Sequence, residues 1–294
     1  MKWLLTMALL AVMLPRMAQA QNTEAVRWCT GHMTGNYHWS ADQIKAQIGA
    51  EIPIELVQTT GSLMNLQRLM TDNCDIAFAQ QDVVDQYGLA NPLSHNSLAV
   101  VKVVYEEYVQ ILCPAISGWK SLSDLANASG RRRLIIGKDG SGIGETWRMM
   151  RILNTKYDAI ERVYQTTDAR AINAVMHSKD TCMMWVSGLN SSDMITANNL
   201  SMKNGKPTLQ LLTIDDDAVF QIKGSNGKPL YRAEVVGSGV YSHLVNGKSV
   251  RMAVIEADLV VRRDAISRPR LDRIIRAIVD LQPVIWARVN PAAD

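Results

Sequence analysis

The stretch IELVQTTGSLMNLQRLMTDNCDIAFAQQD, residues 54–82, sets the fold class. It begins with a short β-prone run, Ile54–Val57, and ends on a second one, Ile76–Ala79. Between them, apolar residues recur at helical spacing from Leu63 to Met70. Strand, helix and strand in this order are typical of a parallel sheet with helices on both faces. The sequence therefore predicts an α/β protein with mostly parallel sheets.

The same alternation extends to both sides of this stretch. Further strands are expected at Val26–Cys29, Ala99–Val104, Tyr108–Cys113, Leu134–Ile136, Cys182–Val186 and Ala253–Val261. Leu271, Ile274 and Ile278 define a final amphipathic helix, which Pro269 opens near its first turn. The apolar face of this helix needs a partner, which a first lobe built from both ends of the chain would supply.

The length of 294 residues fits two lobes. Apolar residues make up 47% of the chain and charged residues 20%, which excludes disordered, collagen-like and coiled-coil proteins. The expected division is a signal peptide over 1–20, the first part of lobe I over 21–114, lobe II over 115–235, and a return to lobe I over 236–294.

The first twenty residues have the pattern of a cleaved export signal. Lys2 gives a positive start, Leu4–Leu14 an apolar run, and Ala18-Gln19-Ala20 small residues at cleavage spacing. A run of about 11 residues rises only about 16 Å as a helix, too short for a hydrocarbon core of about 30 Å. We expect an exported, periplasmic protein.

The charge argues against a nucleic-acid partner. The formal net charge of +3 falls to +1 once the signal residues Lys2 and Arg16 are removed. That leaves no basic excess to follow a phosphate backbone.

Four cysteines, at positions 29, 74, 113 and 182, would meet an oxidising compartment after export. Three complete pairings are open, and the spacings match no zinc motif. Cys113 and Cys182 stand inside apolar runs, where we expect buried thiols, with one disulfide left unassigned among the four.

Three loops share one design, in which a strand ends, small residues follow and a helix begins. They span residues 30–40, 58–65 and 137–146. A helix N-terminus presents free N–H groups and a partial positive charge, and in open α/β sheets such loops line a common crevice. Gly61 and Gly142 allow close approach of the backbone to a ligand. The pattern predicts a site for a small anion.

The order and spacing of several motifs resemble the TAXI family of TRAP-transporter solute-binding proteins. The motifs are Thr30-Gly31-x-x-x-Gly35-x-Tyr37, Gly61-Ser62-x-x-Asn65-Leu66, Asp75-x-x-x-x-Gln80-x-Asp82, Lys120-Ser121-Leu122-x-Asp124-Leu125, Gly140-Ser141-Gly142, Gly188-Leu189 and Leu259-Val260-Val261-Arg262-x-Asp264. The resemblance covers nearly all of the mature chain. It departs from the family at four positions, which bear on ligand choice, namely His32, Met33, Ile143 and Asn190.

This resemblance implies a two-lobed, type II periplasmic-binding-protein fold with a ligand cleft between the lobes. Such a protein captures a small solute, often glutamate, 2-oxoglutarate or a related carboxylate, and delivers it to a sodium-driven TRAP membrane permease. The residues expected to bind the ligand are Thr34, Gly35, Tyr37, Thr60, Gly61, Ser62, Asn65, Gln80, Asp82, Ser141, Gly142, Trp185, Ser187 and Gly188.

Other polar residues favour structural roles. Arg148 has the reach for a ligand carboxylate, although a solvated helix face is the stronger interpretation, and Asp215-Asp216-Asp217 is best explained as a solvated turn or helix start. The sequence shows no nucleophile elbow, no His-Glu-x-x-His and no P-loop, so we expect neither an enzyme, a cofactor nor a metal site. A periplasmic sensor subunit on the same fold is the alternative to transport, and a periplasmic enzyme is a more distant one.

Overall fold

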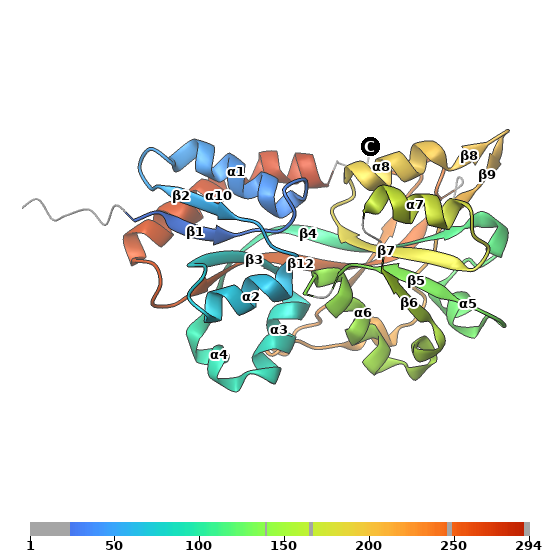
Figure 1. The fold of residues 1–294 in the computed structure, drawn as a ribbon, viewed down its shortest axis with the longest axis horizontal. Coiled ribbons are helices and arrows are strands. Elements are labelled where there is room, and N and C mark those ends of the chain that lie inside the picture. The colour runs from blue at the N-terminus through green and yellow to red at the C-terminus, as the bar shows by residue number, and fades with distance from the viewer. Residues whose placement is uncertain (1–23, 139, 165–166, 246–248, 291–294) are drawn as a thin grey trace, which may run out of the picture.

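The computed structural model describes residues 24–138, 140–164, 167–245 and 249–290. The expected signal peptide therefore lies outside the described residues. Two lobes lie side by side, and strands β4 and β12 run through both of them (Figure 1). The arrangement confirms the predicted α/β class.

Lobe I holds both ends of the described chain. Its elements are β1 (Val26–Cys29), α1 (Asn36–Ile48), β2 (Ile54–Val57), α2 (Ser62–Met70), β3 (Ile76–Gln80), α3 (Gln81–Ala90), α4 (Pro92–Ser97) and α10 (Arg268–Val289). The apolar face of α10 packs with Trp28, Ile44 and Phe78 in one buried cluster, so α10 finds the partner that its amphipathic pattern requires.

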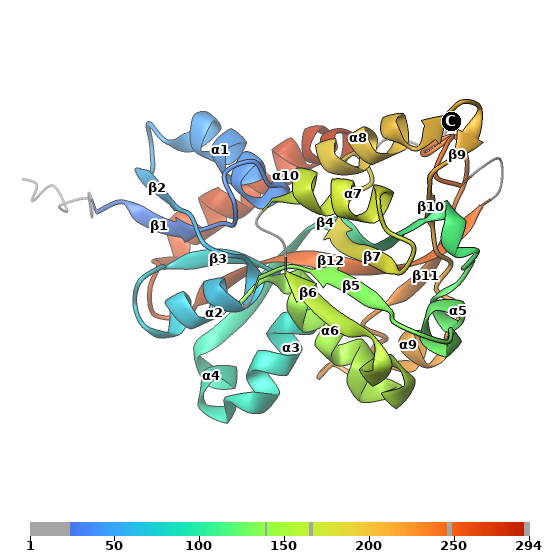
Figure 2. The ribbon, with the colours of Figure 1, turned by 45° about the vertical axis from the view of Figure 1, so that its right-hand side comes forward.

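Lobe II repeats the alternation of strands and helices with additional short elements. They are η1 (Ala115–Ser117), α5 (Leu122–Asn127), β5 (Arg133–Ile136), α6 (Gly142–Leu153), η2 (Thr155–Ala159), β6 (Glu161–Tyr164), α7 (Asp168–Met176), β7 (Thr181–Ser187), α8 (Ser192–Leu200), β8 (Met202–Lys203), β9 (Lys206–Pro207), β10 (Leu209–Leu211), α9 (Ala218–Gln221) and β11 (Arg232–Val236). Seen from the second direction, α7 and α8 cover one face of the lobe and α6 the other (Figure 2).

One sheet connects the two lobes. Its strand order is β2-β1-β3-β12-β4-β7-β5-β6, where β4 spans Leu98–Pro114 and β12 spans Val250–Arg262. The outer strands of each lobe are parallel, and β4 and β12 form a long antiparallel pair between them. The lobes are thus joined by two strands of a shared sheet.

The change of lobe takes place inside these two strands. In β12, Ala257–Val261 pairs with β3 of lobe I, while Val250–Val254 pairs with β11 of lobe II. In β4, Tyr108–Leu112 already pairs with β7 of lobe II. The sequence places the boundaries at 114/115 and 235/236, whereas the pairing partner changes near residue 107 on the way out and near residue 256 on the way back.

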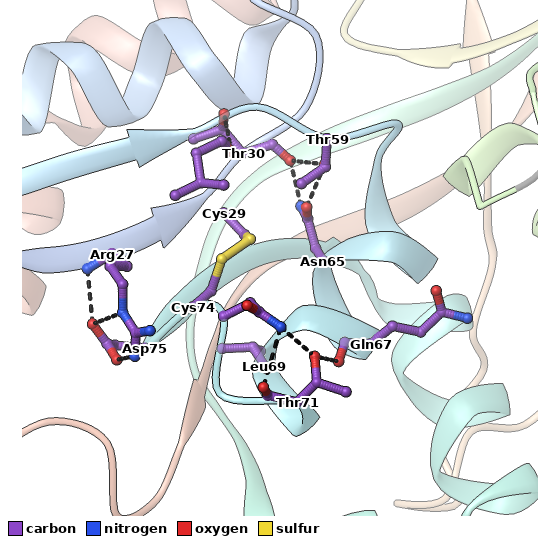
Figure 3. The surroundings of a disulfide bond; sticks show 12 residues. Arg27, Cys29, Thr30, Thr59, Asn65, Gln67, Leu69, Thr71, Cys74 and Asp75 are labelled. Atoms are coloured by element: carbon purple, nitrogen blue, oxygen red, sulfur yellow. Dashed lines mark hydrogen bonds and ion pairs between the residues drawn. A yellow bond between two sulfur atoms is a disulfide. The ribbon is translucent and has the colours of Figure 1, made fainter.

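All four cysteines form disulfides, which corrects the expectation of buried thiols at Cys113 and Cys182. Cys29 pairs with Cys74, and Cys113 pairs with Cys182. The first bond joins the end of β1 to the segment before β3, beside the ion pair of Arg27 and Asp75 (Figure 3). The second joins neighbouring strands β4 and β7. The pairing of the strands brings the cysteines of each disulfide together, and the spacing of the cysteines along the chain does not predict that pairing.

Among the described residues, no helix combines the length and the apolar character needed to cross a membrane.

Candidate functional site

A cavity of about 230 Å³ lies between the lobes, where the parallel strands of both lobes end. Lobe I contributes the loops that follow β1 and β2, and lobe II contributes the loops that follow β5 and β7. A wider cavity of about 570 Å³ shares His32, Thr60, Ser141 and Asp168 with the first, so the cleft continues outward from it. The inner cavity is of a size suited to a small metabolite.

Most of the predicted ligand-binding residues line this inner cavity. Those in the lining are Thr34, Gly35, Tyr37, Thr60, Gly61, Ser62, Gln80, Ser141, Gly142, Trp185 and Ser187. The three loops that share the design of strand end, small residues and helix start are therefore brought together. Binding of a solute by these residues stays a prediction.

Five helices of at least two turns begin at the cavity. Among the described residues, the helices whose first residue lies in the lining are α1 and α2 in lobe I and α6, α7 and α8 in lobe II. The N-caps of α1 and α2 are Gly35 and Gly61, with no side-chain cap and no acidic residue in the first turn. By contrast, α7 and α8 carry Asp168 and Asp193 in their first turns. The positive ends of α1 and α2 thus face the cavity uncompensated, whereas those of α7 and α8 have their own carboxylates.

A chain of polar side chains forms the inner wall. The Tyr37 hydroxyl donates to Oε2 of Glu107 at 3.3 Å and lies 3.5 Å from Oγ of Ser62. Ser62 Oγ in turn accepts from the backbone N–H of Gln80 at 3.2 Å. Gln80 is 2% exposed, and its Nε2 has no hydrogen-bond partner among the described residues. A buried amide N–H group without a partner costs stability, so Nε2 of Gln80 is a candidate donor of a hydrogen bond to a ligand.

Glu107 is the acid of this wall, and only 6% of its surface is exposed. Burial raises its pKa to about 8, and the nearby charge of Asp82 acts in the same direction. Burial also raises the pKa of the Tyr37 hydroxyl well above its usual value. At neutral pH both groups are largely uncharged.

Two further acids stand at the rim. Burial together with the neighbouring charge of Asp168 raises the pKa of Asp193 to about 6, and His32 lowers it in part. Arg288, near the end of α10, is the arginine of the lining; it donates to the carbonyl of Asn190 at 3.3 Å and lies over the ring of Trp39.

The lobes touch next to the cavity through glycines. Gly61 has φ +128°, and a Cβ on it would lie 3.3 Å from Cα of Ser141. A Cβ on Gly142 would lie 1.4 Å from Oε1 of Gln80. The backbone N–H of Met64 donates to the carbonyl of Gly140 at 3.1 Å. Only residues without a side chain allow this approach.

Three of the predicted ligand residues lie outside the lining of the inner cavity. Asn65 is fully buried and donates to the carbonyl of Thr30 (Figure 3). It also donates to the carbonyl of Phe78, so it ties the end of β1 to β3. Gly188 allows the loop after β7 to approach α10, since a Cβ there would lie 2.0 Å from Cγ1 of Val289.

Asp82 is the third, and it joins the lobes instead. It lies at the start of α3, fully buried, and its Oδ2 accepts from the hydroxyls of Thr146 at 2.7 Å and Tyr231 at 2.6 Å, both in lobe II. Burial raises its pKa to about 6 against the lowering effect of these bonds. Nearby, Asp85 accepts from the N–H and hydroxyl of Ser225.

The residues expected to be structural are placed away from the cavity lining. Arg148 bonds to Glu145 and Gln86 on the outside of α6. Asp216 accepts from Asn154 and Tyr157, and Asp215 and Asp217 bond to other segments of lobe II. Within the described residues, no group of three or more His, Cys, Asp or Glu side chains is arranged to hold a metal ion.

Sequence reasoning missed the acids of the lining. Glu107 and its neighbour Glu106 stand between two β-prone runs, Ala99–Val104 and Tyr108–Cys113, and this pair of acids was the available signal. Asp168 and Asp193 each follow a capping residue, Thr167 and Ser191, and by themselves they resemble ordinary first-turn acids. Asp168 and Asp193 lie on two helices of lobe II and Glu107 lies on β4, so only the tertiary structure brings the three acids to one cavity.

Comparison with solved structures identifies the same architecture in ligand-binding proteins. The ligand-binding core of GluR0 in complex with L-glutamate is 10% identical, with 92% of this chain and 98% of that chain covered and a TM-score of 0.53. An ABC-type phosphate transport receptor from Vibrio cholerae is 9% identical, with 90% and 98% covered and a TM-score of 0.52. The substrate-binding protein of an amino acid ABC transporter is 9% identical, with 90% and 99% covered and a TM-score of 0.51.

These likenesses show the fold, and they confirm the two-lobed periplasmic-binding-protein architecture expected from the motifs. No curated protein matches the chain in sequence. A family model described as NMT1-like matches residues 29–268, which is most of the described chain. The chain, a protein with a solute-binding-protein-like fold and a cleft between its lobes, belongs to the NMT1-like family.

Proposed function

We propose that this protein is the extracytoplasmic solute-binding subunit of a TRAP-type transporter of the TAXI kind. It captures a small carboxylate-bearing solute in the inner cavity and delivers it to a membrane permease. The order of the sequence motifs supports the TAXI assignment, and the fold supports capture between two lobes. We further propose that the solute is bound without chemical conversion.

One observation carries the carboxylate assignment. The N-termini of α1, α2 and α6 meet at a cavity in which Gln80 has a buried amide nitrogen without a partner. Free backbone N–H groups and an amide donor are the groups that a carboxylate oxygen accepts from. Their convergence from both lobes would also make binding favour the closed arrangement.

A periplasmic location is part of the proposal. Both disulfides support it, since such bonds persist in oxidising compartments and are rare in the cytosol. The signal-like pattern over residues 1–20 supports it independently.

The test is a thermal-shift screen of organic acids and amino acids on the mature protein, followed by calorimetry of each hit. A solute at 100 times its Kd stabilises the protein by about 2.7 kcal/mol, which is readily measured. Ser62→Ala and Ser141→Ala should each weaken binding about tenfold without unfolding the protein, because each removes a hydroxyl from the lining.

The matched control is Ser123→Ala in α5, a serine outside the cavity lining, which should bind as the wild type does. No stabilisation by any solute, or unchanged affinity in both lining variants, would refute the proposal.

A further inference from the structure

Acidic side chains outnumber basic ones around the inner cavity. In its described lining, the ionisable carboxyls are Glu107, Asp168 and Asp193, and the permanent cation is Arg288. The wider outer cavity adds Lys138, which is exposed. Such a lining would repel a solute that carries only negative charge.

Glu107 is the most constrained of these acids. It is 6% exposed, it faces the cavity, and its recorded hydrogen bond among the described residues is the one from Tyr37. Arg288 is already engaged with the carbonyl of Asn190 and the ring of Trp39. A buried carboxylate without a cationic partner is costly, so Glu107 keeps its proton in the empty cavity, and its charged form calls for a cationic partner that arrives with the solute.

The helix starts next to Glu107 have the complementary chemistry. There the N-caps of α1 and α2 are glycines without acids in the following turn, and Gln80 holds its unpartnered amide donor. The polar chain of Tyr37 and Ser62 links these donors to Glu107. The cavity is therefore bipolar, with donors at the helix starts and an acid on the wall from β4.

We propose that the captured solute carries a protonated amine beside its carboxylate, and that Glu107 receives this amine. The inference rests on the proposed function, because it assigns the second charge of the same solute. It excludes purely anionic dicarboxylates and oxo acids as the physiological ligand class.

Capture of the amine has a consequence for protons. In the empty cavity, Glu107 holds a proton at neutral pH because burial raises its pKa to about 8. When the R–NH₃⁺ group of a solute binds beside Glu107, the O–H bond of the carboxyl breaks and the proton passes to the buffer. The resulting carboxylate pairs with the ammonium group. A solute that is only anionic would leave the carboxyl protonated and would release nothing.

Burial and neighbouring charges also shift the pKa of other groups near Glu107. The groups that face it or share its cavity are Tyr37 from α1, Tyr105 on its own strand, Asp82 from α3, His32 from the loop after β1, Asp168 from α7, Asp193 from α8 and Arg288 from α10. Burial moves the pKa of both tyrosines upward, away from neutral pH. The pKa values of Asp82 and Asp193, about 6, lie below neutral pH.

The experiment compares each amino acid with the 2-oxo acid of the same carbon skeleton, such as L-glutamate with 2-oxoglutarate and L-alanine with pyruvate. Calorimetry at pH 7.5 is run in two buffers of different ionisation enthalpy. We expect an amino acid to bind at least about tenfold tighter than its 2-oxo partner, as fits loss of a hydrogen bond between charged groups. We also expect its binding enthalpy to depend on the buffer, which reports a released proton.

Two variants locate the effect. Glu107→Gln should lower amino acid affinity at least about tenfold, abolish proton release, and leave 2-oxo acid binding equal or tighter. The adjacent acid, Glu106, pairs with Arg232 outside the inner cavity. The control variant Glu106→Gln should therefore bind solutes as the wild type does. If Glu107→Gln does not fold, the comparison of solute pairs on the wild type still decides.

The outcomes separate the two proposals. Binding of 2-oxo acids as tightly as amino acids, without proton release, would overturn the inference and leave the proposed function standing. Absence of binding by every amino acid and organic acid would overturn the proposed function itself.

Discussion

Glu107 and Asp82 are carboxylic acids at the junction between the lobes, and they have different roles there. Both are buried, and burial raises the pKa of both. Asp82 accepts two hydroxyl hydrogen bonds from lobe II and one from the backbone of Val83, so the protein satisfies it. Glu107 has the single bond from Tyr37 and faces a cavity. The difference in partners, rather than in residue type, separates a structural acid from a candidate ligand group.

Glu107 should make the stability of the empty protein depend on pH. The folded pKa of about 8 lies above the ordinary value of 4.5, so the folded state binds more protons than the unfolded state between these values. Stability contributed by the protonated carboxyl is therefore present at low pH and is lost as the pH rises toward 8. The side chain of Glu107→Gln does not titrate, so the variant does not lose this stability as the pH rises. Relative to the wild type, the variant should gain on the order of 1–3 kcal/mol between pH 5 and pH 9.

The measurement is urea unfolding of both proteins at the two pH values. A variant whose stability differs from the wild type by the same amount at pH 5 and pH 9 would show that Glu107 does not titrate in this window.

Asp82 should couple the lobes energetically. Asp82→Asn weakens the acceptor of two hydroxyl hydrogen bonds, and Tyr231→Phe removes one of their donors. We expect each to lower the free energy of unfolding by about 1–3 kcal/mol, because the groups are buried. A double-mutant cycle from urea unfolding should give a coupling of at least about 0.5 kcal/mol, and strictly additive effects would contradict the direct contact.

At the scale of elements, the helix starts define the site. The loops after β1, β2 and β5 each end in a helix whose first residues line the cavity, and glycine stands at the start or the cap of each helix. Glycine at these positions lets backbone from one lobe approach the other. The same feature that exposes N–H groups to a ligand thus also permits contact between the lobes.

Gly142→Ala should damage the site more than an ordinary glycine substitution. The new Cβ would lie 1.4 Å from Oε1 of Gln80 and 2.9 Å from Oγ of Ser62, so Gln80 must move or the lobes must part. We expect solute affinity to fall at least about tenfold and Tm to drop by several degrees.

Gly237→Ala is the control, since a Cβ there meets no heavy atom within 4 Å; it should stay within about 0.5 kcal/mol of the wild type. Wild-type affinity and Tm in Gly142→Ala would mean that this close contact is absent in solution.

At the scale of the whole molecule, two long strands and two disulfides hold the architecture together. β4 and β12 belong to both lobes, so each lobe is built on a strand that the other also uses (Figure 1). One disulfide lies in lobe I, and the other ties β4 to β7 in lobe II. Each lobe therefore carries its own covalent tie, while the crossing itself is held by backbone hydrogen bonds and packing.

Each disulfide should stabilise the fold separately. The bonds close segments of 45 and 69 residues, for which constraint of the unfolded chain is worth about 4 kcal/mol each at most. The pairs Cys29→Ala with Cys74→Ala, and Cys113→Ala with Cys182→Ala, should each lose about 2–4 kcal/mol in urea unfolding.

The folded wild type, treated with a reductant and a thiol-labelling reagent, should show no labelled cysteine, because all four cysteines are fully buried. Labelling should begin only when denaturant is added. Rapid labelling of the native protein would contradict the described burial of the two disulfides.

The local sequence was enough to predict the alternating elements and half of the residues in the described lining. Ser62, Ser141 and Gly142 each stand where an apolar strand gives way to a helix, and such junctions depend on neighbours a few residues away. Hydrophobic periodicity and capping chemistry act over this range, so the fold class and the three loops follow from the chain itself.

Only the tertiary structure decided which distant groups meet. Three features join residues that are far apart in the chain. Cys113 pairs with Cys182, Asp82 accepts hydrogen bonds from Thr146 and Tyr231, and Glu107 lines a cavity built from both lobes. The pKa and the partner of a buried acid depend on what the opposite wall presents, and the sequence near the acid does not contain that wall. For this protein, local chemistry determined where a ligand can be held, and long-range packing determined the charge that the ligand meets there.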